Sequence, residues 1–338
     1  MARQGGDPLS LQDLGWDERR DRELAGHRGT AARVARIDRG ICTALTPDPT
    51  RATTAGQPIA TGDWVILAHG PSSGDLPAVV AILERRSAFI RHRSGEESTP
   101  QVVAANADVV FLVTSLDTPL SRARIERYLT LGWQSGAVPV LVLTKADERT
   151  ATELAAASLT VHDLAPDVAV RPLSARTGEG VDALVAEFLG PGRTAALVGP
   201  SGVGKSTLIN RIAGSEEMAT GATRRDGKGR HTTTHRQLIV LGASGILIDT
   251  PGMRALGLWE SDEGLNQAFA DIEDLATQCR FADCQHRSEP GCAVVAGVTS
   301  GILEGERVAR WRKLNDELDA VADRQEAAAR RPGNGRRR

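Results

Sequence analysis

Lysine is the residue type that this sequence largely lacks. The chain carries 41 basic residues, yet only four of them are lysines, at Lys145, Lys205, Lys228 and Lys313. Where arginine is the rule, a retained lysine indicates a position that needs a compact ammonium group rather than a planar guanidinium fork. Two of the four, Lys145 and Lys205, lie in the sequence motifs described below.

Aromatic residues, excess charge and long apolar runs are also scarce. Aromatics make up 3% of the chain, and the formal net charge is -2. The overall charge gives no sign of a nucleic-acid binder, so any such role must depend on local patches. No apolar run is long enough to cross a bilayer, and the first residues lack the apolar core of a signal peptide. We expect a cytoplasmic protein without a membrane partner.

Cysteine is rare as well, but its spacing is informative. Three of the four cysteines lie with one histidine in the pattern C-x4-C-x-H-x5-C, at Cys279, Cys284, His286 and Cys292. In a reducing compartment such bunching favours metal binding over disulfides, and three thiols with an imidazole suit a closed tetrahedral Zn²⁺ site. The alternative is three buried reduced cysteines beside an incidental histidine. Cys42 is interpreted as an ordinary core or surface cysteine.

The length of 338 residues predicts two or three domains, and 41% hydrophobic with 25% charged residues is typical of globular proteins. Residues 1–29 are polar and predict a loosely ordered extension. Short β-type runs separated by turn residues from about residue 30 predict a small β-barrel. Between Arg28 and Arg93 nine basic residues face five acidic ones. A basic barrel face would suit RNA, but with so few aromatics ordinary surface arginines explain the excess equally well.

A glycine-rich motif dominates the middle of the chain. The sequence GPSGVGKST fills the pattern G-x-x-x-x-G-K-[ST] between a short apolar run and a helix-like start. In such a loop backbone N–H groups surround the α- and β-phosphates, the lysine reaches the β- and γ-oxygens, and the serine hydroxyl ligates Mg²⁺. A chance glycine turn before a helix is the alternative. The predicted nucleotide-binding residues here are Gly199, Pro200, Ser201, Gly202, Val203, Gly204, Lys205, Ser206 and Thr207.

Two earlier loops predict a guanine site. A buried strand at 139–143 leads into Thr144, Lys145, Ala146 and Asp147, a variant of the sequence N-K-x-D. Such an aspartate can accept hydrogen bonds from guanine N1–H and N2–H₂, and the lysine stem covers the base. A further strand candidate ends in Ser174 and Ala175, which resembles the loop whose backbone N–H reads guanine O6. The tetrapeptide alone is a weak signal, so its weight comes from this second loop.

After the phosphate motif the sequence predicts two switch segments. Residues 221–234 are rich in Gly, Arg and Thr, which is typical of a mobile segment. A hairpin then leads to Asp249 and, within the sequence D-T-P-G, to Gly252. Asp249 can hold Mg²⁺ through water, and the Gly252 N–H can meet the γ-phosphate.

The order TKAD, SAR, GPSGVGKS, HTTT and DTPG resembles the circularly permuted GTPases, specifically the ribosome small-subunit-dependent GTPase A family. The resemblance covers about residues 30–318 and implies a multidomain protein. Its parts would be a disordered extension at 1–29, an N-terminal OB-type β-barrel at 30–97, a central α/β P-loop GTPase domain with a circularly permuted, mostly parallel sheet at 98–258, a mainly helical zinc module at 259–322 and a basic tail at 323–338.

The resemblance also implies a function. Such a protein binds the small (30S) ribosomal subunit and its 16S rRNA near the decoding centre, hydrolyses GTP to GDP and phosphate when stimulated by the subunit, and promotes release of other assembly factors late in maturation. It would act as a monomer, with Mg²⁺ bound beside GTP and one structural Zn²⁺. The residue after D-T-P-G is Met253, which has no hydrogen-bond donor to orient water. His231 is the nearest candidate for that task, and the resemblance implies the catalytic role for it; the alternative is that His231 only contacts RNA or solvent. One of Thr232, Thr233 and Thr234 should join Ser206 and Asp249 at Mg²⁺, and Thr233 is the one assigned.

One departure and two alternatives stay open. Thr144 stands where the family usually has asparagine, which predicts weaker ties to the phosphate loop and weaker nucleotide binding but an intact choice of guanine. A GTP-dependent RNA-binding module or checkpoint protein whose hydrolysis is incidental would carry the same motifs. A P-loop ATPase or kinase is the third class, and Asp147 with the Ser174 and Ala175 loop argues against it. The arginine-rich tail either contacts rRNA phosphates or is simply solvated.

Overall fold

The computed structural model describes residues 9–47, 50–68, 75–92, 100–214, 237–250 and 262–329. The chain divides into two compact units, which are considered separately. The first, the barrel–sheet unit, comprises Met1–Leu120 and Ser135–Gly257. The second, the helical unit, comprises Ser121–Gln134 and Leu258–Arg338. None of the helices within the described ranges combines the length and apolar character needed to cross a membrane.

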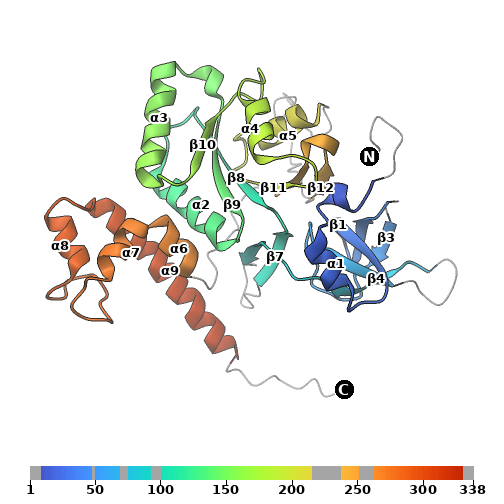
Figure 1. The fold of residues 1–338 in the computed structure, drawn as a ribbon. Coiled ribbons are helices and arrows are strands. Elements are labelled where there is room, and N and C mark those ends of the chain that lie inside the picture. Colours follow the sequence, from blue (N-terminus) through green and yellow to red (C-terminus); the bar gives the residue numbers. More distant parts are fainter. Residues whose placement is uncertain are drawn as a thin grey trace, which may run out of the picture. The chain divides into compact units, whose positions relative to one another are not determined.

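The N-terminal strands of the barrel–sheet unit close into a five-stranded barrel in the order β1-β2-β3-β5-β4 (Figure 1). Its interior is built from small and β-branched residues such as Ala32, Val34, Ala44, Val65 and Val79, which are all buried. The predicted small barrel is thereby confirmed. The strands are β1 Thr30–Asp38, β2 Ile41–Leu45, β3 Thr50–Thr53, β4 Trp64–Ala68 and β5 Ala78–Ile82.

The segment before the barrel differs from the loosely ordered extension predicted for residues 1–29. Its described part contains a 3₁₀ helix, η1 (Gln12–Leu14), and a helix, α1 (Glu18–Leu24). Leu14 is fully buried, and the edge of the Trp16 ring packs on Trp64 of the barrel with ring centroids 4.9 Å apart. This apolar contact orders the N-terminal segment, because its polar residues alone could not offset the conformational entropy that the segment loses when it folds.

The central sheet follows the strand order β10-β9-β8-β11-β13-β12. All neighbouring pairs are parallel except β12 with β13, as expected for a mostly parallel GTPase sheet. β8 is buried along its whole length, which explains its continuous apolar sequence. The strands are β8 Val109–Ser115, β9 Val138–Thr144, β10 Ala169–Pro172, β11 Thr194–Val198, β12 Gln237–Val240 and β13 Ile246–Asp249.

Short helices and a hairpin complete the barrel–sheet unit, and Figure 1 shows α3, α4 and α5 beside the central strands. The hairpin of β6 and β7 lies in the chain between the barrel and the sheet. These elements are β6 Ala88–His92, β7 Pro100–Ala105, η2 Ala146–Glu148, α3 Ala151–Leu164, α4 Val181–Phe188, α5 Lys205–Ala213 and η4 Gly242–Ser244.

The strand order places a switch point between β8 and β11. From β8 the chain proceeds outward through β9 to β10, and from β11 it proceeds to the opposite side, first to the edge strand β12 and then back to β13. Ligands of open parallel sheets bind at the carboxyl ends of the strands where the order reverses in this way. The loops after β8, β9 and β11 therefore converge on one edge, which positions the candidate site.

The barrel meets the sheet through a close backbone approach. Gly62 has φ +90°, and a Cβ at this position would lie 2.2 Å from the carbonyl oxygen of Ala105 and 2.8 Å from Ile248. Beside it the buried Arg33 guanidinium donates to the carbonyl oxygens of Leu14, Asn106 and Gly62. Burial disfavours its charged form and lowers the pKa of Arg33 to about 10. These contacts fix the barrel, the N-terminal segment and the start of β8 to one another.

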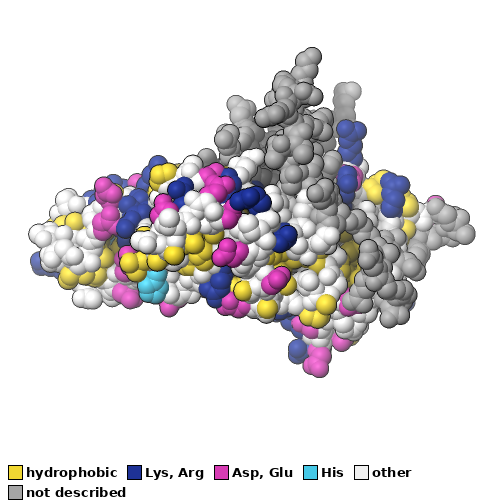
Figure 2. Space-filling model, turned by 90° about the horizontal axis from the view of Figure 1, so that it is seen from above, with side chains coloured by type: hydrophobic (Ala, Val, Ile, Leu, Met, Phe, Trp, Pro, Cys, Tyr) yellow, Lys and Arg dark blue, Asp and Glu magenta, His cyan; other side chains and the backbone are white. Residues whose placement is uncertain are grey.

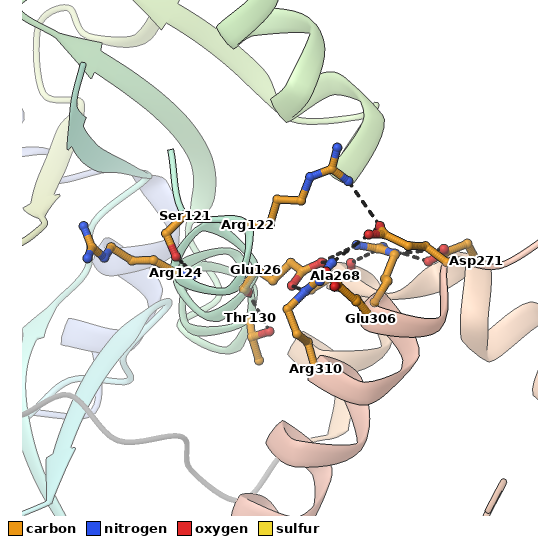
Figure 3. Close-up of polar contacts among 11 residues, drawn as sticks. Ser121, Arg122, Arg124, Glu126, Thr130, Ala268, Asp271, Glu306 and Arg310 are labelled. Carbon is orange, nitrogen blue, oxygen red and sulfur yellow. Dashed lines mark hydrogen bonds and ion pairs between the residues drawn. The ribbon is translucent and has the colours of Figure 1, made fainter. Parts of the chain in front are cut away.

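The helical unit contains one helix from the middle of the chain. Glu126 of α2 is fully buried and accepts hydrogen bonds from Arg307 (2.9 Å) and Arg310 (2.5 Å) of α9 (Figure 3). A Cβ at Gly264 of α6 would lie 2.6 Å from the Thr130 carbonyl oxygen, so α6 packs closely on α2. The helices are α2 Arg122–Gln134, α6 Asp262–Ala268, α7 Ala270–Ala276, α8 Ala293–Thr299 and α9 Gly305–Ala329.

This grouping bears on the predicted domains. Residues 121–134 fall inside the range 98–258 expected for the GTPase domain, yet they belong to the helical unit. The remaining boundaries stay predictions. On the face shown in Figure 2, basic and acidic side chains are interspersed rather than gathered by sign, in keeping with the net charge of -2. The described residues of that face offer no electrostatic argument for RNA binding.

Candidate nucleotide site and metal cluster

The phosphate motif forms the turn between β11 and α5. Gly199 cannot carry a side chain, because a Cβ would lie 2.3 Å from the Val113 carbonyl oxygen. Gly204 has φ +96° and caps α5, which begins at Lys205. This conformation favours glycine because L-residues with side chains are strained there. The loop thus presents the N-terminus of α5 at the switch point, where free backbone N–H groups suit an anion.

A buried pair of opposite charges lies at the base of this loop. The Lys205 ammonium donates 2.8 Å hydrogen bonds to the carbonyl oxygens of Gly199 and Pro200. Burial lowers the pKa of Lys205, and the nearby Asp249 carboxylate partly opposes this. Burial likewise raises the pKa of Asp249, with Lys205 acting in the opposite direction. Asp249 at the end of β13 and Ser206 in α5 carry hard oxygen atoms of the kind that Mg²⁺ prefers, and the assignment of both residues to Mg²⁺ stays a prediction.

Thr144 ties the guanine loop to the phosphate loop. Its hydroxyl donates a 2.6 Å hydrogen bond to the carbonyl oxygen of Val203, with the Thr114 carbonyl at 3.2 Å also within reach. The side chain is 1% exposed, so this bond is shielded from water. The sequence predicted that replacing asparagine by threonine loosens this connection. The structure retains one direct tie between the two loops.

Lys145 and Asp147 lie on the turn that follows β9. Lys145 has φ +60°, in the left-handed region that non-glycine residues rarely occupy, and its ammonium pairs with the Asp117 carboxylate. Asp147 in η2 accepts a hydrogen bond of 3.0 Å from Arg176. Hydrogen bonds from Ser174 and Arg176 lower the pKa of Asp147. The carboxylate is therefore ionised at neutral pH and can only accept hydrogen bonds, as guanine N1–H and N2–H₂ require.

The loop after β10 closes against the same turn. The N–H of Leu173 donates to the Leu143 carbonyl oxygen (2.9 Å), and the N–H of Ala146 donates to the Leu173 carbonyl oxygen (3.1 Å). Ser174 is fully buried, and its hydroxyl accepts a hydrogen bond from the backbone N–H of Thr177. The two sequence-predicted guanine loops are thus held together by backbone hydrogen bonds.

The predicted metal ligands of the helical unit form a tight cluster. The four ligand atoms of Cys279, Cys284, His286 and Cys292 all lie within 4.8 Å of one another. Three of the separations are 3.9 Å between the sulfurs of Cys279 and Cys292, 3.4 Å from Cys279 Sγ to His286 Nδ1, and 3.6 Å from Cys292 Sγ to the same nitrogen. Tetrahedral Zn²⁺ with ordinary bond lengths places sulfurs about 3.8 Å apart and sulfur and nitrogen about 3.6 Å apart. The donor set and its spacing fit one Zn²⁺.

Comparison with known proteins identifies the family. The family model described as RsgA GTPase matches residues 82–259. The small ribosomal subunit biogenesis GTPase RsgA of Streptomyces avermitilis is 44% identical over 95% of this chain and 89% of its own length. The chain belongs to the RsgA GTPase family. The RsgA of Methanosarcina acetivorans is 41% identical over 94% of this chain, and that of Xanthomonas campestris pv. campestris is 47% identical over 78%.

Solved structures agree with the family fold. YjeQ from Thermotoga maritima has a TM-score of 0.62 and 26% identity, and the match covers 85% of this chain and 98% of that one. YloQ, a circularly permuted GTPase, has a TM-score of 0.59 and 21% identity over 90% of this chain and 97% of its own, which supports the fold alone. The expected permuted GTPase fold with a barrel and a Cys/His cluster is confirmed, and membership of the family makes the chain a GTP hydrolase.

Two charged residues at the guanine loops were missed by sequence reasoning. Asp117 follows β8 by two residues and pairs with Lys145, while Arg176 pairs with Asp147. The available signal for Asp117 was its place directly after a buried strand, because charged residues at the carboxyl ends of neighbouring parallel strands meet at one edge. Arg176 stood in the quoted SAR sequence, but only its two predecessors were assigned a role.

Several predicted site residues lie outside the described part of the chain. These are His231, assigned to catalysis, Thr233, assigned to Mg²⁺, and Gly252, assigned to the γ-phosphate. The predicted switch segment 221–234 and Met253 fall there too. The assignments of these positions rest on the sequence and on the family resemblance.

Proposed function

We propose that this family member binds GTP with guanine specificity and hydrolyses it under control of the small ribosomal subunit. The observation that carries the proposal is the bond between Thr144 and Val203, since it joins the guanine loops and the phosphate loop into one site at the switch point. The relatives named small ribosomal subunit biogenesis GTPase support the choice of partner.

Each side chain takes a role that its surroundings support. Asp147 accepts hydrogen bonds from the guanine edge, the Ala175 backbone N–H reads O6, and the Lys145 stem covers the ring. Lys205 neutralises the β- and γ-phosphates from the base of the loop. Ser206 and Asp249 would hold Mg²⁺, which would polarise the phosphates. The other nucleotide contacts are assigned to Thr144, Ser174, Gly199, Pro200, Ser201, Gly202, Val203, Gly204, Thr207 and Gly252.

For hydrolysis we assign His231 the task of orienting the attacking water, and Thr233 completes the Mg²⁺ shell. Met253 cannot donate or accept a strong hydrogen bond, so the residue that follows D-T-P-G is unsuited to this task. His231→Ala should retain GTP binding and lose subunit-stimulated turnover. Stimulated turnover at the wild-type rate would remove His231 from the mechanism.

The remaining roles concern assembly. The protein acts in the cytoplasm as a monomer, contacts 16S rRNA late in subunit maturation and promotes release of other assembly factors. A Zn²⁺ held by Cys279, Cys284, His286 and Cys292 would be structural, because four protein ligands would leave no position for a substrate.

The deciding experiment measures GTP hydrolysis by the purified full chain alone, with small ribosomal subunits and with large subunits. We expect stimulation by small subunits of at least one order of magnitude and none by large subunits. Ser206→Ala serves as the control, since it removes the Mg²⁺ ligand and should abolish the stimulated activity. Equal stimulation by both subunits, or by neither, would overturn the proposed partner.

A further inference from the structure

The Lys145 side chain is fixed at both of its ends. Its backbone adopts φ +60°, a strained conformation that persists only where surrounding contacts impose it. Its ammonium is held by Asp117. A lysine stem is flexible and carries considerable rotamer entropy, so restraining both ends defines the course of its methylene groups.

Asp117 is itself held in place. The Ser115 hydroxyl donates a 2.5 Å hydrogen bond to one carboxylate oxygen of Asp117, which leaves the other oxygen for Lys145. Ser115 is buried at the end of β8 and therefore anchors this contact to the sheet. The two hydrogen-bonding partners lower the pKa of Asp117, so its carboxylate is ionised at neutral pH.

The loops that carry the two residues are also joined directly. The N–H of Leu116 donates to the Thr144 carbonyl oxygen at 3.0 Å, and the Arg149 guanidinium donates to the Leu116 carbonyl oxygen at 2.8 Å. Asp117 and Lys145 thus each lie one residue beyond this backbone contact. Both contacts end on Leu116, so movement of one loop relative to the other is restricted at the residue that precedes Asp117.

We propose that Asp117 is a positioning residue for guanine-nucleotide binding, holding the Lys145 ammonium so that the lysine stem lies across the face of the base. This inference rests on the proposed guanine site. Asp117 acts through Lys145 and makes no contact with the nucleotide. The base-edge hydrogen bonds belong to Asp147, so the two carboxylates have separable effects: Asp147 discriminates between bases, whereas Asp117 supports any purine.

The size of the effect follows from exposure. The side chains of Lys145 and Asp117 are 31% and 39% exposed, so solvent screens their attraction. Pairs of this kind contribute a modest interaction, corresponding to about a 2- to 5-fold change in an equilibrium constant. Asp117→Asn should therefore weaken GDP binding by about 2- to 5-fold at low salt, and the difference should shrink at high salt.

The first test compares GDP with IDP, which lacks the 2-amino group, by calorimetry on the full chain. Asp117→Asn should weaken both nucleotides by the same factor, and Asp117→Glu should recover much of the loss. Asp163→Asn, which removes an exposed carboxylate from α3, is the matched control and should change neither affinity. Unchanged or tighter binding in Asp117→Asn, or a loss confined to GDP, contradicts the proposal.

A double-mutant cycle tests whether Asp117 acts through Lys145. Lys145→Met keeps an unbranched stem but removes the ammonium, so Asp117→Asn should have no further effect in that background. The same 2- to 5-fold loss there would show that Asp117 acts independently and would overturn the inference. Asp147→Asn tests the proposed guanine site independently of Asp117. If Asp147 reads the base, this variant must lower the affinity for GDP relative to the affinity for XDP. Melting temperatures of all variants confirm that each is folded.

Discussion

The hydroxyl of Thr144 donates a 2.6 Å hydrogen bond to the carbonyl oxygen of Val203, across 59 positions of sequence. Thr144 ends β9 and Val203 lies in the phosphate loop after β11, so neither residue's motif includes the other. The bond makes the base-reading and phosphate-binding halves of the site one structure. A threonine hydroxyl has a single proton, so it can supply only one strong bond where an asparagine amide can supply two.

This contact predicts a measurable dependence of nucleotide binding on residue 144. Thr144→Val keeps the shape of the side chain but leaves the Val203 carbonyl without its partner, which costs about 1–3 kcal/mol. Part of this cost should appear as weaker GDP binding, by about tenfold, and Thr144→Asn should restore wild-type affinity or exceed it. Fluorescent GDP titrations measure the change. Thr160→Val, which removes an exposed hydrogen bond within α3, is the control, and equal effects of the two valine variants would contradict the assignment.

The burial of Asp249 predicts a trade between stability and activity. Its folded-state pKa is raised above the ordinary value of 3.8 because burial disfavours the ionised form, and Lys205 only partly offsets this. The unfolded chain therefore ionises first, and above about pH 4 the buried charge costs folding free energy that is absent below it. Asp249→Asn removes the cost, so its stability relative to wild type should increase as the pH rises from 4 to 7.

Urea unfolding of both proteins at each pH provides the measurement, and GTP hydrolysis by the same samples should be lost in the variant. Asp182→Asn, which removes an exposed carboxylate from α4, is the control for loss of a surface charge. A gap between wild type and Asp249→Asn that stays constant with pH would mean that the carboxylate titrates alike in the folded and unfolded chains.

A site residue can be predicted from the sequence when its interaction partner is close in sequence. It is missed when the fold alone brings the partner near. The phosphate loop could be predicted, because Gly199 and Gly204 satisfy local conformational demands that a short pattern records. The metal cluster was equally local. Asp117 and Arg176 were not assigned, because their partners are 28 and 29 positions away and become neighbours only through strand order; the position of Asp117 after a buried strand was the one available signal.

The N-terminal segment and α2 illustrate the same limit. Trp16 is ordered by Trp64, a contact that composition cannot reveal. Glu126 reads as an ordinary surface acid of an amphipathic helix, and only Arg307 and Arg310, more than 180 positions later, explain its burial. Because α2 lies in the chain between two strands of the central sheet, the sequence assigns it to the domain of that sheet. No local signal indicates that α2 belongs to the helical unit.

The metal cluster predicts that the helical unit depends on Zn²⁺ for its fold. Cys284→Ser should lower the zinc content of the purified protein below one ion per chain. It should also lower the melting temperature of the helical unit, because metal binding supplies much of the folding free energy of such small modules. Cys42→Ser, a buried cysteine of the barrel far from the cluster in sequence, should keep its zinc. Full zinc content together with unchanged melting of Cys284→Ser would exclude this thiol as a ligand.

The buried carboxylate of Glu126 predicts a large effect from a small change. Glu126→Gln preserves size but removes the buried charge that Arg307 and Arg310 share, so Arg307 keeps only Asp271 as a counterion and Arg310 keeps only Glu304 and Glu306, both at 3.7 Å. Breaking a buried ion pair from one side costs about 3–5 kcal/mol, whereas an exposed pair contributes little. Hydrogen exchange at the amides of α9 should therefore accelerate strongly in Glu126→Gln.

Glu306→Gln is the matched control, because Glu306 contacts Arg310 only at 3.7 Å and its side chain is 86% exposed. Arg307 keeps Asp271 as a second partner, so the larger share of the loss should fall on Arg310, and Arg310→Met combined with Glu126→Met should recover part of the stability that the single charge removal destroys.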